Sequence, residues 1–149
     1  MTDPLYAKDL LRLAAHAHGA GHWDHADAEG MAHNPACGDR ISVQLQLDEH
    51  GHIRAFAHET KACVLTQASA SILGAHLAGA DAASLHRLRA DVAGMLQNGA
   101  PPAHPFEDYA ALAGAAPYRN RHACVLLPID AALKALDAHN ESGQSAEHK

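Results

Sequence analysis

Residues 40–48 alternate between apolar and polar side chains, and this pattern constrains the fold more than any other in the chain. The apolar positions are Ile41, Val43, Leu45 and Leu47. A period of two residues predicts a strand with one face on a core and the other toward solvent. The turn sequence at 48–51 ends in Gly51, so residues 52–59 should pair back as the second strand of a hairpin. Such a sheet needs helices to cover its apolar face.

The rest of the chain is predicted to supply those helices. Helical spacing and stop signals indicate helices at 3–17, at 64–79, at 81–88, at 90–97, at 106–113 and at 129–138. A short edge strand is expected within 22–33. The predicted fold class is α+β: a small, mostly antiparallel three-stranded sheet with helices packed on one face. We expect a single domain over residues 1–139 and a polar, mobile tail over 140–149.

Composition and charge exclude several classes of function. Only 4% of the 149 residues are aromatic although 48% are hydrophobic, so the core should consist of small, closely packed side chains. The formal net charge is -6 and no basic run occurs, which argues against a surface for nucleic acid. No apolar stretch approaches the roughly 20 residues that span a bilayer, and no signal pattern opens the chain. We therefore expect a soluble cytoplasmic protein in a reducing compartment, without membrane contact.

The three cysteines, Cys37, Cys63 and Cys124, are the side chains most suggestive of chemistry. Their odd number and wide spacing argue against a disulfide framework. Asp39 lies two residues after Cys37, and three thiolates with one carboxylate form a complete ligand set for a soft divalent metal or a small iron–sulfur cluster. Cys63 falls between a predicted strand and a predicted helix, where the positive end of the helix dipole favours a thiolate.

Each of these residues also has a plainer interpretation. A single cysteine is usually a small apolar core residue, and Asp39 could simply brace a turn after Gly38. The 14 histidines are scattered and are expected on the surface, although His122 could act as an alternative ligand beside Cys124.

The order of motifs along the chain resembles the U-type iron–sulfur cluster assembly proteins, which include the NifU N-terminal domain, IscU and SufU. The resemblance is carried by Asn-Pro-x-Cys-Gly-Asp at 34–39, by Cys-x-x-x-x-Ala-Ser-Ala-Ser at 63–71, and by Arg-x-x-Cys at 121–124. The long interval between Cys63 and Cys124 is similar to that of the SufU branch. The absence of the Leu-Pro-Pro-Val-Lys sequence of IscU before Cys124 also favours SufU.

This resemblance implies a metal site formed by Cys37, Asp39, Cys63 and Cys124, with Arg121 steadying its negative charge. It implies a zinc-dependent sulfurtransferase that accepts sulfur from a PLP-dependent, SufS-like cysteine desulfurase, with Cys37 as the persulfide acceptor. The sulfur would then pass to downstream cluster-assembly machinery. The alternative is a non-enzymatic scaffold that assembles a transient 2Fe–2S cluster and transfers it to apo iron–sulfur proteins. Whether the protein is an enzyme and whether zinc or a cluster occupies the site stay open.

The chain departs from the family pattern near two of the cysteines. Ala62 replaces the usual glycine before Cys63, and the bulky pair at 125–126 replaces small residues after Cys124. Pro128 is expected to delay the start of the last helix.

Overall fold

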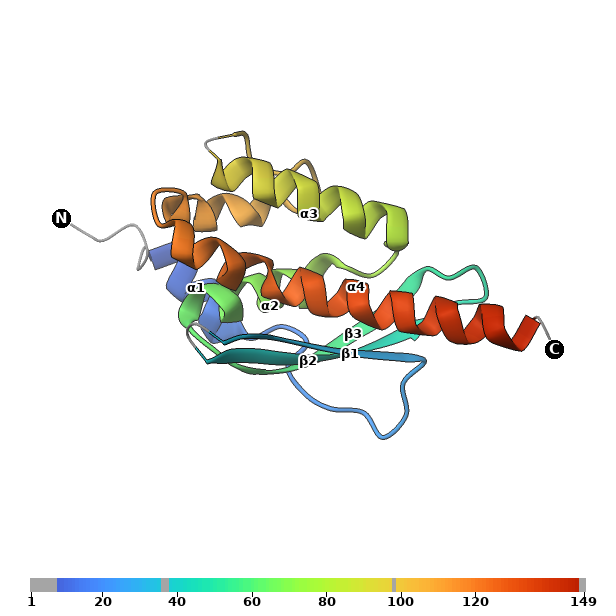
Figure 1. The fold of residues 1–149 in the computed structure, drawn as a ribbon. Helices are drawn as coiled ribbons and strands as arrows, with labels where there is room; N and C mark the ends of the chain where they lie inside the picture. The colour runs from blue at the N-terminus through green and yellow to red at the C-terminus, as the bar shows by residue number, and fades with distance from the viewer. Residues whose placement is uncertain (1–7, 36–37, 98, 148–149) are drawn as a thin grey trace.

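The computed structural model describes residues 8–35, 38–97 and 99–147. Its elements follow one another as helix α1 (Lys8–His16), strands β1 (Ala28–Asn34), β2 (Asp39–Leu47) and β3 (Ile53–Lys61), helices α2 (Val64–His76) and α3 (Ala82–Leu96), the 3-10 helix η2 (Glu107–Ala115) and helix α4 (Arg119–Glu147). Figure 1 shows the helices together on one side of the sheet. The part of the predicted first helix before Lys8 lies outside the described residues.

The three strands form an antiparallel sheet in the order β1-β2-β3. β1 pairs with β2 from Ala28 opposite Leu45 to Asn34 opposite Asp39. The turn between β2 and β3 is closed by the carboxylate of Asp48, which accepts hydrogen bonds from the backbone N–H groups of His50 and His52. The predicted hairpin and the predicted fold class are therefore confirmed.

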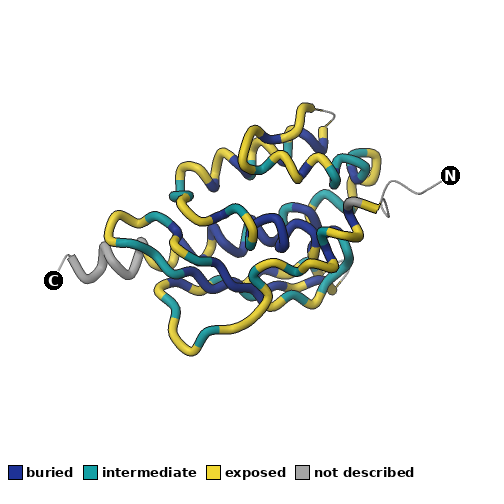
Figure 2. Tube along the Cα trace, turned by 180° about the vertical axis from the view of Figure 1, so that it is seen from behind, coloured by how far each residue is buried: buried dark blue, intermediate teal, exposed yellow. Residues whose placement is uncertain are grey.

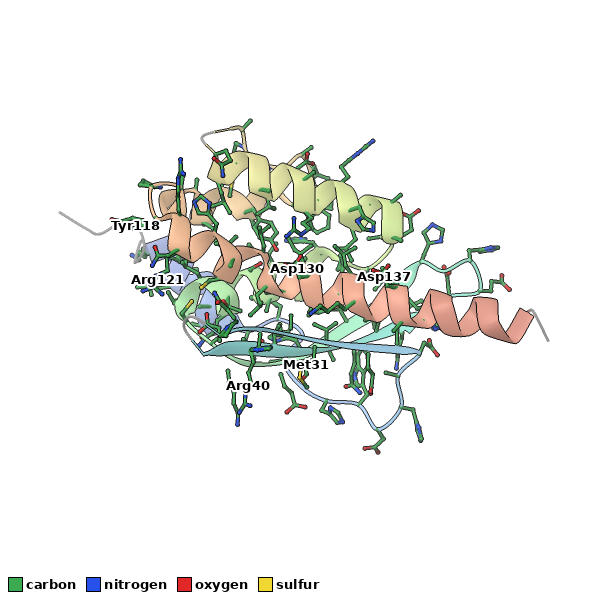
Figure 3. The ribbon with its side chains drawn as sticks, in the orientation of Figure 1. Met31, Arg40, Tyr118, Arg121, Asp130 and Asp137 are labelled. Atoms are coloured by element: carbon green, nitrogen blue, oxygen red, sulfur yellow. The ribbon has the colours of Figure 1, made fainter. Side chains whose placement is uncertain are left out.

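Helices α2 and α4 carry the core that covers the sheet. The apolar face of β2 is almost fully buried, as is most of α2, and Figure 2 shows buried segments meeting between the sheet and these helices. α1 packs beside α2, while α3 lies on the outer side of α4 (Figure 1). The opposite sheet face carries exposed side chains such as Met31 and Arg40, which point away from the helices in Figure 3.

The core is built from small residues at close range, as the composition predicts. A Cβ atom added to Gly30 of β1 would lie 2.3 Å from the carbonyl oxygen of Ala131 and 2.6 Å from the amide nitrogen of Ala135. A Cβ atom added to Gly74 of α2 would lie 2.0 Å from the carbonyl oxygen of His18. Backbone therefore packs directly on backbone at both places. The missing side chain of Gly30 lets α4 approach β1 closely, and that of Gly74 lets the segment after α1 approach α2 closely.

Two of the predicted helical boundaries are wrong. The two short helices expected at 81–88 and 90–97 form one helix, α3, because one buried apolar stripe runs through both halves. Its members are Leu85, Leu88, Val92, Met95 and Leu96.

The last helix begins at Arg119 rather than at residue 129, and it contains Pro128. Proline removes one helical N–H donor, but hydroxyl groups of α2 bind two carbonyls in the turn before it, so the helix continues. Helical backbone also extends from residue 140 to Glu147, and the mobility of that tail stays a prediction. Within the described residues, no helix is both long and apolar enough to cross a membrane.

Candidate metal centre

Cys63 occupies the junction between β3 and α2. It is the N-cap residue of α2, with extended backbone angles of φ -68° and ψ 170°, and the helix begins at Val64. The predicted placement of this cysteine between strand and helix is confirmed. The side chain is partly buried, and its N-cap position places it at the positive end of the helix dipole.

Asp39 and Cys124 meet Cys63 from two other elements. Asp39 is the first residue of β2, and Cys124 lies in the second turn of α4. The ligand atoms of these three side chains all lie within 4.8 Å of one another. Asp39 is 5% exposed and Cys124 is fully buried, so among these three residues Cys63 offers the route to solvent.

Hydrogen bonds hold the Asp39 carboxylate in place. Its Oδ1 accepts from the backbone N–H of Cys63 at 3.1 Å, and its Oδ2 accepts from the hydroxyl of Thr66 at 3.0 Å. Burial opposes ionisation, but the bonds from the side chains of Cys63, Thr66 and Cys124 and from the Cys63 backbone outweigh it and lower the pKa of Asp39. The carboxylate is therefore ionised and already in contact with both thiols.

The donor set fits a thiophilic metal. Sulfur and oxygen ligands of a tetrahedral zinc lie about 3.3 to 3.8 Å apart, because the bonds are ~2.0 to 2.3 Å long. The three ligand atoms are within 4.8 Å of one another, so side-chain movements of about 1 Å or less would close them around an ion. No histidine joins this group, which is the one cluster of metal-ligating side chains found in the described part of the chain.

Other residues singled out in the sequence have different outcomes. Cys37, the expected fourth ligand and sulfur acceptor, lies outside the described residues. Arg121 lies in the first turn of α4, as Figure 3 shows, and its role toward the site stays a prediction. His122 points elsewhere, because its Nε2 bonds the carbonyl oxygen of Ala116 at 2.9 Å. The plainer interpretation, that Asp39 braces a turn after Gly38, stays a prediction. The carboxylate of Asp39 bonds to the junction between β3 and α2 and adjoins both thiols.

Sequence reasoning missed two residues that touch the site. The Nδ2 of Asn34 at the end of β1 donates to the sulfur of Cys124 at 3.9 Å. The buried hydroxyl of Thr66 lies 3.6 Å from the sulfur of Cys63 and also contacts Asp39 and the backbone of Cys124. The only sequence signal for Thr66 is a hydroxyl three residues after a helix-capping cysteine, and that signal is weak by itself.

Comparisons with known proteins identify the family of the chain. The sequence matches the NifU-like N terminal domain family over residues 5–125, and the chain therefore belongs to that family. The predicted resemblance to U-type proteins is thus confirmed. A comparison with curated protein sequences gave no match.

Solved structures show the same fold. The N-terminal part of a nitrogen-fixing NifU-like protein from Brucella abortus is 34% identical, with a TM-score of 0.87 over 93% of this chain and 96% of that one. A crystal structure described only as a hypothetical protein is 26% identical, with a TM-score of 0.78 over 91% of this chain and 99% of that one. A protein from Fervidobacterium islandicum, described as a candidate iron–sulfur cluster assembly scaffold of the SUF system, shares the fold with 18% identity and a TM-score of 0.80 over 91% and 99% of the two chains.

Proposed function

We propose that this protein takes part in iron–sulfur cluster assembly through a site formed by Cys37, Asp39, Cys63 and Cys124. The observation that carries the proposal is the cluster of one carboxylate and two thiols in a chain of the NifU-like family. Cys37 is two residues from Asp39 in the sequence, so it is close enough along the chain to complete the ligand set.

The role that we favour is acceptance of sulfur from a PLP-dependent, SufS-like cysteine desulfurase, with Cys37 as the acceptor. The thiolate of Cys37 attacks the sulfane sulfur of the persulfide on the desulfurase cysteine. A new S–S bond forms on Cys37, the original S–S bond breaks, and the desulfurase cysteine leaves as a thiolate. The exchange needs no oxidant or reductant, and the sulfur can then move to downstream assembly proteins.

Zinc is the metal that fits this role, because it binds thiolates and has no redox chemistry of its own. When bound, it would keep the cysteines in the deprotonated, nucleophilic form. The long segment between Cys63 and Cys124, which contains α3 and η2, supports this role because its length is similar to that of the SufU branch. The half-exposure of Cys63 leaves the edge of the site open toward a partner.

The second candidate is a scaffold that receives iron and sulfide as cargo and passes a 2Fe–2S cluster to apo iron–sulfur proteins. The same thiols and carboxylate suit this cargo, and a carboxylate is a harder and more exchangeable ligand than a thiolate. The Fervidobacterium neighbour is described as a scaffold, and its 18% identity carries only the fold.

One experiment separates the two roles. The protein is purified without air, its zinc, iron and labile sulfide are measured, and desulfurase turnover is followed with and without it. One zinc per chain without sulfide, together with stimulation that Cys37→Ala abolishes, supports sulfur transfer. Iron with matching sulfide and no stimulation supports the scaffold.

Matched variants test the site itself. Asp39→Ala should retain folding but lose stimulation, whereas Asp91→Ala, at an exposed aspartate of α3, should keep both. If Asp39→Ala stimulates the desulfurase fully, Asp39 has only the structural role. A wild-type chain that binds neither zinc nor iron would refute the proposed function.

A further inference from the structure

Thr66 contacts the backbone or side chain of three residues of the candidate centre. Its Oγ1 lies 3.0 Å from Oδ2 of Asp39, 2.9 Å from the carbonyl oxygen of Cys124 and 3.6 Å from the sulfur of Cys63. The side chain is fully buried, so these groups rather than water must satisfy the hydroxyl. It comes from the first turn of α2, while Asp39 and Cys124 come from β2 and α4.

Pro128 explains why the carbonyl of Cys124 is available. In an α-helix, this carbonyl would accept a hydrogen bond from the N–H of residue 128. Proline has no N–H, and its ring also crowds the carbonyl four residues earlier. Because Pro128 lies inside α4, it cannot donate to the carbonyl of Cys124, and Thr66 supplies a donor from α2. The next carbonyl, that of Val125, accepts from Ser69 at 2.7 Å.

We propose that Thr66 is a positioning residue of the metal centre: its hydroxyl ties the carboxylate of Asp39 to the backbone of Cys124, and Pro128 frees the carbonyl that it uses. This inference rests on the proposed function, because it concerns the same site. It adds a residue that does not bind the metal but fixes the positions of Asp39 and Cys124 relative to each other.

The hydroxyl has one proton and two acceptors. The proton is shared between Oδ2 of Asp39 and the carbonyl oxygen of Cys124. Each carboxylate oxygen has two lone-pair sites, so Oδ2 can bind a metal and still accept from Thr66. The buried hydroxyl therefore keeps an acceptor with or without a metal, so ligation of Asp39 leaves no unsatisfied donor. Without this hydroxyl, the Asp39 carboxylate and the Cys124 carbonyl each lose the hydrogen bond that Thr66 donates.

The test compares zinc affinity among full-length variants by competition with a chromophoric chelator under reducing conditions. Thr66→Val removes the hydroxyl and keeps the side-chain volume, and we expect zinc to bind about 10-fold to 100-fold more weakly. Thr66→Ser keeps the hydroxyl and should restore affinity to within about threefold of wild type. Thr66→Ala replaces Thr66→Val if the valine variant does not fold.

Ser69→Ala is the matched control. It removes a buried hydroxyl one turn further along α2 that binds the neighbouring carbonyl of α4 but no ligand side chain. We expect it to lower the urea unfolding midpoint without weakening zinc binding. Equal weakening of zinc binding in Ser69→Ala and Thr66→Val would overturn the inference, because the effect would then reflect general loosening of the contact between α2 and α4.

The role of Pro128 is tested by repeating Thr66→Val in a Pro128→Ala background. Alanine restores an N–H for the Cys124 carbonyl, so the loss of unfolding stability caused by Thr66→Val should be smaller there. An unchanged loss would contradict the role given to Pro128. A wild-type chain that does not bind zinc would refute the proposed function of the site, whereas wild type and Thr66→Val binding zinc equally would overturn only this inference.

Discussion

Replacing Gly30 by alanine should destabilise the protein through a clash between β1 and α4. The added Cβ would lie 2.3 Å from the carbonyl oxygen of Ala131 and 2.6 Å from the amide nitrogen of Ala135. Both atoms belong to helical backbone and cannot turn aside as a flexible side chain would. Helix α4 must therefore retreat from the sheet, or the strand must bend.

The size of the effect follows from two opposing contributions. Overpacking of a well-packed core costs typically about 1 to 3 kcal/mol, and backbone contacts this short favour the upper end. The lower entropy of the unfolded chain with alanine returns about 0.4 to 1 kcal/mol. We expect a net loss of roughly 2 kcal/mol, or a melting temperature lower by about 4 to 8 °C for a chain of this size.

Gly94→Ala is the control, because nothing lies within 4 Å of a Cβ added at this position inside α3. The same substitution should stabilise there by about 0.5 to 1 kcal/mol, since glycine is unfavourable in a helix. Urea unfolding of both variants measures the midpoints and slopes. If Gly30→Ala unfolds at the same urea concentration as wild type, or at a higher one, the contact between β1 and α4 is not as close as described.

Three further predictions concern pH, capping and metal uptake. Burial lowers the pKa of His58 below 6.5, and a hydrogen bond to the carbonyl of His18 opposes this shift only in part. The unfolded chain therefore takes up this proton more readily than the folded chain. The contribution of neutral His58 to folding stability is complete above about pH 6.5 and is lost as the pH falls through the folded pKa. The drop in urea midpoint between about pH 7.5 and 5.5 should be smaller in His58→Gln than in wild type. Asp81 caps α3 by accepting from the N–H of Ser84 at 2.8 Å, so Asp81→Ala should cost about 1 kcal/mol in urea unfolding, whereas Asp91→Ala on the exposed face should cost little. Zinc uptake should release on the order of two to three thiol protons near pH 7, and a calorimetric heat that does not vary with the ionisation enthalpy of the buffer would contradict this.

The sequence was sufficient for the parts of the fold that depend on local patterns. The alternation at 40–48 predicted β2, and the turn at 48–51 predicted its hairpin with β3. The position of Cys63 at the start of α2 followed from the change of period between strand and helix. These predictions succeed because each depends on neighbours within a few residues of one another.

The helical boundaries were harder to predict, since packing overrides local signals. Pro128 normally ends or delays a helix, yet α4 passes through it because Thr66 and Ser69 bind carbonyls of the preceding turn. Leu88 and Val92 belong to one buried stripe, so α3 does not break where two shorter helices were expected.

The sequence alone determined the identity of the candidate ligands and the order in which the chain presents them. It could not determine how they are held. Only the tertiary structure brings the hydroxyl of Thr66 to Asp39, 27 positions away in the chain, and to the backbone of Cys124, 58 positions away. Local periodicity reports which face of an element is buried. Which atoms meet across elements depends on how closely the helices and the sheet pack, and here small residues at their contacts set that distance.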